Sequence, residues 1–295
     1  MGTGGARVLY GCMGLGDVGQ AQAAVRAALD AGITAFDHAD IYGGGRAEAV
    51  FGEVLAGDAG LRERITVQTK CGIRPDLGVY DLRGASITAR VEQSLERLRT
   101  DVVDVLLLHR PDPLADPADV AAALTSLHRQ GLVRAFGVSN MSGAQIALLQ
   151  HHLELPLVAD QLEMSLHRRD WVEAGVLVDT PESAEVGFPL GTVEYCMRHG
   201  VELQAWGALA QGRYTGREQN PTAELVARLA AAKGTTPETI VLWWLQRHPA
   251  RIAPVIGTTN PDRIRACADA ARREPDLTRE EWYELWLSAR GHRLP

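Results

Sequence analysis

The sequence predicts one α/β domain, folded as a closed (β/α)8 TIM barrel with an additional helix at its C-terminal end. Strand-like and helix-like segments alternate in eight pairs along the 295 residues. The strand segments are mostly continuous apolar runs, as expected for a parallel sheet covered on both faces. Eight such units in roughly this length are typical of a barrel. No change of composition marks a linker, so we expect a single domain over residues 1–295.

Eight short apolar segments are the predicted strands, and turn signals or helical patterns separate them. In chain order they are RVLYGCM (7–13), ITAFD (33–37), ITVQTK (65–70), VVDVLLLH (102–109), VRAFGVSN (133–140), LVADQLE (157–163), VELQAW (201–206) and RIAPVIG (251–257). If these strands are parallel neighbours, the residues at their C-terminal ends meet at one end of the barrel.

Helical periodicity follows the strands, and several helices have clear start or stop signals. Asp17 is a predicted N-cap, and Gly131 is a predicted C-terminal stop. Thr236 caps a helix that has proline at its first position, and Thr278 opens a capping box with Glu281. The predicted helical segments are 17–32, 46–57, 86–99, 117–131, 142–152, 192–200, 222–233, 237–248, 260–273 and the segment that begins at 278.

Two irregular stretches, 165–189 and 208–221, are predicted insertions in the barrel. We expect both to lie over the C-terminal face, where loops form the pocket of such folds. The first stretch contains Trp171 and Phe188. Trp171 fits either a pocket wall or a packed core position.

The composition excludes several classes of function. A net charge of −7 and a pI near 5.7 argue against nucleic acid as a partner. No apolar run approaches the length that spans a bilayer, and the N-terminal residues do not have the pattern of a signal peptide. The four cysteines are far apart and form no CxxC pair, which predicts reduced thiols, no bound metal and a cytoplasmic location.

A glycine motif near the N-terminus offers a competing fold. Gly14, Gly16 and Gly19 spell GLGDVG, which matches the GxGxxG pattern of a doubly wound dinucleotide-binding fold. Asp37 even stands at the end of the next strand, where such folds have a ribose-binding acid. The barrel is favoured because the strand–helix repeat continues to eight units, and because the chemical residues cluster after the second, third and fourth strands. Both folds predict a nicotinamide enzyme.

Four chemically active residues lie at or just after strand ends: Asp37, Tyr42, Lys70 and His109. On neighbouring parallel strands their side chains converge on one pocket. A buried lysine needs an acidic partner, and Asp37 on the adjacent strand is the natural one for Lys70. A nearby ammonium stabilises phenolate, so we expect Lys70 to lower the pKa of Tyr42 towards the range useful for acid catalysis.

Each of these residues also has a structural explanation. Tyr42 fits a packing position on the rim, Asp37 a loop cap, and His109 an ordinary strand-end histidine. Taken together they favour hydride transfer to a carbonyl carbon, with Tyr42 as proton donor and His109 directing the carbonyl oxygen.

Seven motifs in order make the chain resemble the aldo/keto reductase superfamily: DHADIYGG, TKCG, LLLHRPDP, FGVSN, DQLEMS, QAWGALAQGR and PVIGTTNPDRI. The resemblance is strongest to bacterial oxidoreductases that share DHADIYGG, and it covers nearly the whole chain. It implies a (β/α)8 barrel that binds NADP(H) without a metal. It also implies that Asp37, Tyr42, Lys70 and His109 are the catalytic tetrad.

The resemblance further implies a coenzyme site along the C-terminal ends of the strands. Ser139, Asn140 and Gln161 would hold the nicotinamide carboxamide, Trp206 would stack on its ring, and the loop from Leu209 would follow the pyrophosphate. The residues implied to bind the coenzyme are Gly11, Cys12, Met13, Ser139, Asn140, Gln161, Trp206, Gly207, Leu209, Gly212, Arg213, Gly257, Thr258, Thr259 and Arg263.

The segment GTTNPDRIRAC predicts phosphate binding. Asn260 caps a helix whose first residues have free N–H groups, and Arg263 suits a 2′-phosphate, which favours NADPH. The chain departs from the family at Gly257, where many members have lysine, and at Ala266 and Cys267, where many have Glu and Asn. These departures leave NADH as an alternative coenzyme. The N-terminal hairpin of many members is reduced here to a short remnant, residues 1–6.

The predicted function is therefore NADPH-dependent reduction of an aldehyde or ketone, with a small-molecule carbonyl compound as substrate. Two alternatives remain. Lys70 would serve as a Schiff-base nucleophile in a non-redox barrel enzyme. A binding protein would use the nicotinamide coenzyme as a sensed ligand.

Overall fold

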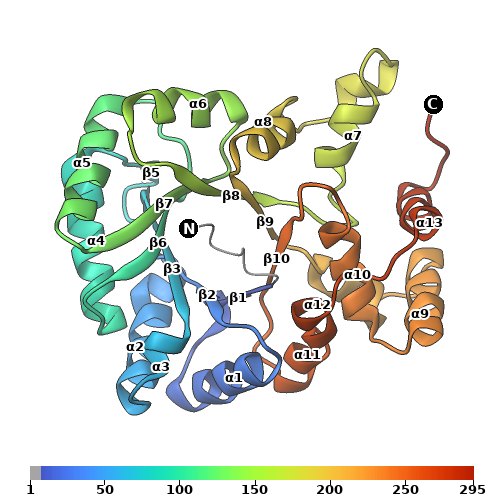
Figure 1. Cartoon of the computed structure of the whole chain (residues 1–295), viewed down its shortest axis with the longest axis horizontal. Coiled ribbons are helices and arrows are strands. Elements are labelled where there is room, and N and C mark those ends of the chain that lie inside the picture. The colour runs from blue at the N-terminus through green and yellow to red at the C-terminus, as the bar shows by residue number, and fades with distance from the viewer. Residues whose placement is uncertain (1–7) are drawn as a thin grey trace.

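The computed structural model describes residues 8–295, so the expectation for residues 1–6 lies outside the described part of the chain. Eight strands close into a parallel barrel in the order β1-β10-β9-β8-β7-β6-β3-β2. Figure 1 shows these strands as a ring with helices around it. The barrel strands are β1 Leu9–Gly11, β2 Ala35–Asp37, β3 Thr66–Cys71, β6 Val103–Leu108, β7 Val133–Ser139, β8 Leu157–Glu163, β9 Glu202–Trp206 and β10 Ala253–Ile256.

The closed barrel confirms the predicted fold class and excludes the doubly wound alternative. β1 pairs in parallel with both β2 and β10, so the sheet has no open edge beside the GLGDVG turn. The longer helices cover the outside of the barrel. They are α1 Val18–Asp30, α2 Arg46–Gly57, α4 Gly84–Leu98, α5 Pro117–Arg129, α6 Gly143–His152, α8 Thr192–His199, α9 Pro221–Lys233, α10 Pro237–Gln246 and α13 Arg279–Arg290.

The predicted helix caps are confirmed. The side chains of Asp17 and Thr236 accept hydrogen bonds from the backbone three residues ahead, and Thr278 and Glu281 form the capping box. The predicted segment 260–273 is wrong as one helix, because it is divided into α11 Pro261–Arg265 and α12 Ala268–Arg272. The carbonyl oxygen of Ala266 accepts a 3.1 Å hydrogen bond from the Thr239 hydroxyl of α10, which diverts it from a continuous helix.

Smaller elements were not predicted from the sequence. After β3 the chain forms an antiparallel hairpin of β4 Ile73–Arg74 and β5 Val79–Tyr80. The short helices α3 Leu61–Arg64 and α7 Asp170–Val176 lie before β3 and within the 165–189 stretch. In α7, Trp171 is buried against Trp244 and His248, with ring centroids 5.4 and 5.1 Å away. Trp171 is therefore a packing residue and not a pocket wall.

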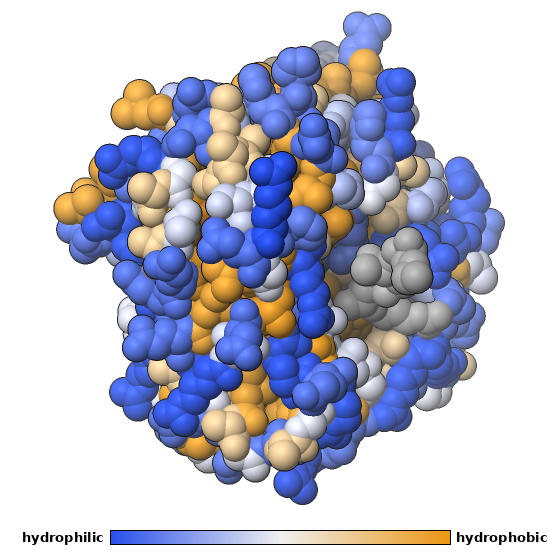
Figure 2. Space-filling view, turned by 60° about the vertical axis from the view of Figure 1, so that its left-hand side comes forward, coloured by the Kyte–Doolittle hydropathy of each residue, from blue (hydrophilic) through white to orange (hydrophobic). Residues whose placement is uncertain are grey.

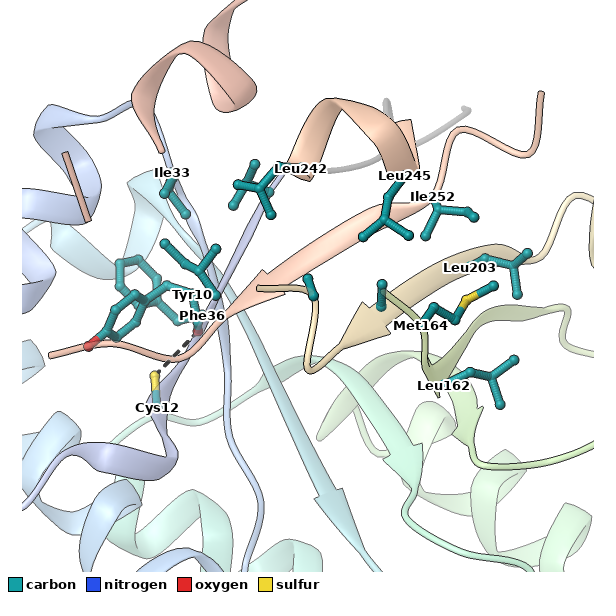
Figure 3. Close-up of a cluster of buried hydrophobic side chains, with 14 of the residues drawn as sticks. Tyr10, Cys12, Ile33, Phe36, Leu162, Met164, Leu203, Leu242, Leu245 and Ile252 are labelled. Atoms are coloured by element: carbon teal, nitrogen blue, oxygen red, sulfur yellow. Dashed lines mark hydrogen bonds between the residues drawn. The ribbon is translucent and has the colours of Figure 1, made fainter. Parts of the chain in front are cut away.

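The main core lies between the barrel and its helices. Tyr10 of β1 packs on Phe36 of β2 with ring centroids 5.8 Å apart, and Leu242 and Leu245 of α10 lie near β10 (Figure 3). A separate small apolar cluster consists of Leu9, Ala35, Ala253 and Val255 on β1, β2 and β10. The outer surface in Figure 2 is mostly hydrophilic, with hydrophobic side chains visible in a band between polar ones.

Within residues 8–295, no helix is both long enough and apolar enough to cross a membrane. In the same part of the chain, no group of three or more His, Cys, Asp and Glu side chains is arranged to hold a metal ion. The four cysteines are free and buried.

Candidate active site

Lys70 and Asp37 form a buried ion pair at the C-terminal ends of β3 and β2. The Lys70 Nζ atom lies 2.8 Å from Asp37 Oδ1 and 2.7 Å from Oδ2, and it also donates to the His38 carbonyl at 2.9 Å. Lys70 is 1% exposed and Asp37 is 2% exposed. The expected pairing of these two residues is confirmed.

Tyr42 reaches this pair through a tight turn anchored on β3. The backbone N–H groups of His38 and Asp40 donate to carbonyl oxygens of Gln68 and Lys70, at 2.8 and 2.9 Å, and so extend the pairing of β2 beyond its last residue. Three glycines follow Tyr42 with φ of 59°, 67° and 91°, a backbone region that residues with a Cβ rarely enter. The turn leaves the Tyr42 hydroxyl 3.2 Å from Lys70 Nζ.

The expected direction of the Tyr42 pKa shift is wrong. Burial raises the pKa of Tyr42 above its ordinary value, and this effect exceeds the lowering by Lys70. Burial would lower the pKa of Lys70, but Asp37 and Tyr42 outweigh it and raise that pKa. At neutral pH the pair is therefore a protonated phenol beside a charged ammonium. This state suits a proton donor whose conjugate base is stabilised at once by the lysine.

His109 follows β6 and faces the tyrosine. Its backbone N–H donates to the Cys71 carbonyl at 2.9 Å, and its ring meets the Tyr42 ring edge-on with centroids 6.2 Å apart. Burial, together with Lys70 and Arg110, lowers the pKa of His109 to about 3. The imidazole is therefore neutral, and its buried Nδ1 has no hydrogen-bond partner among residues 8–295.

Ser139, Asn140 and Trp206 meet at the ends of β7 and β9. Asn140 has a left-handed backbone, with φ of 58°. Its Nδ2 donates to Ser139 Oγ at 2.8 Å and to the His109 carbonyl at 3.2 Å, and its Oδ1 accepts from the Trp206 indole at 3.2 Å. Gln161, which was expected beside Ser139 and Asn140, points its side-chain amide to another residue. Its Nε2 atom donates to Gln204 at 3.1 Å, inside the barrel.

The loop after β9 is compact. Gly207 and Gly212 have φ of 69° and 84°, and Leu209 packs against the core. Ala210 also lies in the left-handed region, with φ of 46°. The guanidinium of Arg213 is paired with Glu218 at 3.4 Å, so this cation is partly satisfied within its own loop.

A second group of expected residues surrounds the turn after β10. β1 pairs with β10 here, and a Cβ on Gly14 would lie 3.1 Å from the Thr259 methyl group, so the two turns are adjacent. Gly257 and Arg263 are exposed, and the Asn260 side chain already accepts from the N–H groups of Asp262 and Arg263. Arg263 forms no ion pair with any residue in 8–295. Of the residues after β1, Met13 is 69% exposed and Cys12 is fully buried.

A cavity of about 280 Å³ lies beside Asn140. It is lined by residues at or after the C-terminal ends of β6, β7 and β8, including Arg110, and by Arg168 and Phe188 of the 165–189 stretch. The expectation that this stretch reaches the C-terminal face is confirmed. Sequence reasoning missed two buried polar residues below the site, Gln68 and Gln204, and the half-buried Glu202 beside them, although glutamine within ITVQTK and VELQAW was a visible signal.

The chain is similar to known proteins over most of its length. The sequence model of the aldo/keto reductase family matches residues 7–285. A 6-dehydroglucose reductase of Agrobacterium fabrum is 38% identical over 298 residues, which cover 97% of this chain and 94% of that protein. The oxidoreductase YdhF of Escherichia coli is 38% identical over 275 residues, or 90% of this chain and 86% of that protein.

Solved structures share the fold. A crystal structure of an aldo/keto reductase from Klebsiella pneumoniae in complex with NADP and acetate has a TM-score of 0.74 and 25% identity, and covers 95% of this chain and 89% of its own. The holo form of an aldo-keto reductase from Bacillus halodurans has a TM-score of 0.76 and 24% identity, and covers 95% and 90%.

Proposed function

The chain belongs to the aldo/keto reductase family, and we propose that it reduces an aldehyde or ketone to an alcohol with NADPH, using Tyr42 as the proton donor. The observation that carries this proposal is the 3.2 Å contact between the Tyr42 hydroxyl and the Nζ atom of Lys70, which Asp37 holds through both carboxylate oxygens. Family membership makes the chain a nicotinamide-dependent oxidoreductase. The four site residues and their roles are our proposal.

The proton-transfer step follows from these contacts. NADPH, when bound, supplies the hydride for the carbonyl carbon. Tyr42 donates its hydroxyl proton to the carbonyl oxygen, which becomes the alcohol, and Lys70 stabilises the phenolate left behind. Asp37 keeps the buried Lys70 charged. His109, which is neutral, lies where it can donate a hydrogen bond to the carbonyl oxygen without competing for the proton.

The residues present fit a nicotinamide coenzyme. We propose that Ser139 and Asn140 bind the carboxamide, that Trp206 covers the ring, and that Gly257, Thr258, Thr259 and Arg263 bind the adenosine phosphate. The exposed Arg263 has a free guanidinium for a 2′-phosphate, which supports NADPH over NADH. The remaining proposed contacts are Gly11, Cys12, Met13, Gln161, Gly207, Leu209, Gly212 and Arg213.

For the substrate, we propose a small carbonyl compound that carries hydroxyl groups. The cavity beside Asn140 is lined by the polar side chains of Arg110, Ser142, Gln145 and Thr192, which suit such groups. Ser142 and Gln145 also form the capping box of α6, and Thr192 accepts from the Gly143 N–H, so only their remaining hydrogen-bonding capacity is open to a ligand. Two of the relatives are named 6-dehydroglucose reductase, which is consistent with a sugar-derived carbonyl.

The Schiff-base alternative is disfavoured by the state of Lys70. A nucleophilic lysine needs a lowered pKa and a free amine, whereas burial beside Asp37 and Tyr42 leaves the pKa of Lys70 raised and its ammonium bound to both carboxylate oxygens. No observation specifically favours the sensor alternative.

The experiment is a panel of aldehydes, ketones and oxidised sugars, assayed by the loss of NADPH absorbance with NADH in parallel. We expect at least one hydroxylated carbonyl compound to be reduced, with a higher kcat/KM for NADPH than for NADH. Failure of every compound to oxidise either coenzyme would contradict the proposed function.

A further inference from the structure

Below the proposed site, the interior of the barrel contains a layer of buried amides. Barrel interiors are usually filled by branched apolar side chains. Here Gln68 of β3, Gln161 of β8 and Gln204 of β9 are 2%, 2% and 3% exposed. Gln68 is in register with Asp37, and Gln161 with Gln204. A buried amide destabilises the fold unless its polar atoms are bonded, so this layer calls for an explanation.

The amides form a connected network that ends on the carboxylate of the ion pair. Gln68 Nε2 donates to Asp37 Oδ1 at 2.6 Å and to Gln204 Oε1 at 2.8 Å. Gln204 Nε2 donates back to Gln68 Oε1 at 3.1 Å and to Glu202 Oε1 at 3.0 Å. Gln161 Nε2 donates to Gln204 Oε1 at 3.1 Å.

Only one assignment of nitrogen and oxygen satisfies the amides of Gln68 and Gln204. An ionised Asp37 only accepts hydrogen bonds, so the Gln68 atom that faces it must be the nitrogen. If the Gln204 amide turned over, its oxygen would face the oxygens of Gln68 and Glu202, and its nitrogen would face two other nitrogens. Glu202 therefore fixes the direction of Gln204, and Gln204 fixes the direction of Gln68.

We propose that Gln68, oriented by Gln204 and Glu202, is a positioning residue that holds the Asp37 carboxylate in the place from which it positions Lys70 and Tyr42. This inference rests on the proposed function. Asp37 Oδ1 accepts from both Gln68 and Lys70, and Oδ2 accepts from Lys70, so two residues hold the carboxylate. Without the Gln68 donor, only Lys70 holds the carboxylate, so the ion pair can shift as a unit and move Lys70 relative to the phenol.

Displacement of a reacting group by about 1 Å can reduce a rate by about 100-fold. We therefore expect removal of the Gln68 donor to lower kcat more than it changes coenzyme affinity.

The sharpest test is Gln68→Glu, which keeps the size of the side chain and replaces the donor by a carboxyl group. The titratable groups around it are Asp37 and Lys70, and beyond them Tyr42, Cys12 and Glu202. Beside the Asp37 carboxylate the new group has a raised pKa. When ionised it repels Asp37. When protonated it can donate to Asp37 but no longer to Gln204.

We expect kcat of Gln68→Glu to fall about 10- to 100-fold, and to fall further as pH rises through a range in which the parent is flat. Gln22→Glu, the same change at an exposed position of α1, is the matched control and should leave kcat and its pH profile unchanged. Coenzyme binding, measured by fluorescence, and the thermal melting curve show whether each variant is folded.

If Gln68→Glu fails to fold, three other variants test the same inference through their kcat. They are Gln68→Leu, Glu202→Gln and Glu202→Leu. Gln68→Leu removes the donor without adding a titratable group, so kcat should fall at all pH values with no new ionisation. Glu202→Gln retains an acceptor for Gln204, whereas Glu202→Leu does not, so the leucine variant should lose several-fold more kcat than the glutamine variant.

The inference is overturned if folded Gln68→Glu and Gln68→Leu keep the parent kcat and pH profile, or if only KM for the coenzyme changes. That result is distinct from failure of the proposed function, in which the parent protein itself reduces no carbonyl compound.

Discussion

The two ends of the proposed site are built in opposite ways. At the proton-transfer end, Asp37 and Lys70 are almost completely buried, and they are hydrogen-bonded to each other and to Gln68 and Tyr42. At the coenzyme-phosphate end, the segment 257–263 is largely exposed, and the Arg263 guanidinium forms no ion pair with any residue in 8–295.

This difference follows from what each end must do. The proton donor has to be held in place before the substrate arrives, and a buried charge is stable only when it is paired and hydrogen-bonded. A phosphate is itself a charged partner, so the residues that bind it can stay in water until it arrives. We therefore expect changes at the first end to affect stability and turnover, and changes at the second to affect only coenzyme affinity.

The largest effect is expected from breaking the buried ion pair. Lys70→Met leaves Asp37 as an unpaired buried carboxylate and should lower the free energy of unfolding by ~3–5 kcal/mol. The double variant Asp37→Asn/Lys70→Met removes both charges and should recover most of that stability while remaining inactive. Denaturant unfolding and NADPH oxidation measure the two quantities. A double variant as unstable as the single one would contradict this account of the pair.

A pH-dependent effect is expected from Asp40, in the turn that carries Tyr42. Burial raises the pKa of Asp40 from 3.8 to about 7, although Arg90 opposes the shift. Because the pKa of Asp40 is higher in the folded state, the folded state binds this proton more tightly than the unfolded state does. The free energy of unfolding therefore falls as pH rises from about 4 to 7. At ~1.4 kcal/mol per unit this loss approaches ~4 kcal/mol.

The free energy of unfolding of Asp40→Asn should therefore rise relative to that of the parent as pH increases from about 4 to 7. Above pH 7 the difference between the two proteins should stay constant. Denaturant titrations at several pH values measure this difference. Parallel stability profiles for the two proteins between pH 4 and 7 would show that Asp40 is ionised in the fold.

At the other end, Arg263→Ala should weaken NADPH binding about 10-fold or more, since hydrogen bonds to charged groups contribute ~1.5–3 kcal/mol. KM for NADH, stability and kcat at saturating coenzyme should not change. Arg265→Ala is the matched control, because Arg265 lies on the same helix but is paired with Asp262 at 3.0 Å. Equal losses in both variants would remove Arg263 as the phosphate ligand.

The smallest effect is expected from adding a cation at Gly257. A Cβ there would meet no atom within 4 Å, and its φ is not in the left-handed region, so a lysine fits without strain. Gly257→Lys should tighten NADPH binding by up to about 5-fold, as expected for an exposed charge pair. The gain should disappear at high salt. Unchanged affinity at low salt would mean that the phosphate lies elsewhere.

Much of the fold could be predicted because the strand signals are local. The eight apolar runs and the caps at Asp17, Thr236 and Thr278 depend on neighbours in the sequence, and all are confirmed. The break in 260–273 could not be predicted, because it depends on a hydroxyl from α10 that reaches Ala266. The single domain over residues 1–295 stays a prediction.

The sequence predicted which residues form the site better than it predicted their pKa shifts and hydrogen bonds. Strand-end positions were enough to bring Asp37 and Lys70 together. The sign of the Tyr42 pKa shift depends on how deeply the phenol is buried, which no sequence pattern gives. The contact between Gln68 and Gln204 joins residues 136 positions apart across the barrel, so it too was visible only in three dimensions.

The most direct test of the account is the turnover of Tyr42→Phe, measured with NADPH binding on the same preparation. The phenylalanine keeps the ring and removes only the hydroxyl beside Lys70. We predict that kcat falls about 10²- to 10⁴-fold, as for loss of a general acid, while the Kd for NADPH is unchanged. A variant that reduces the same carbonyl compound at close to the parent rate would contradict the assignment of Tyr42 as the proton donor.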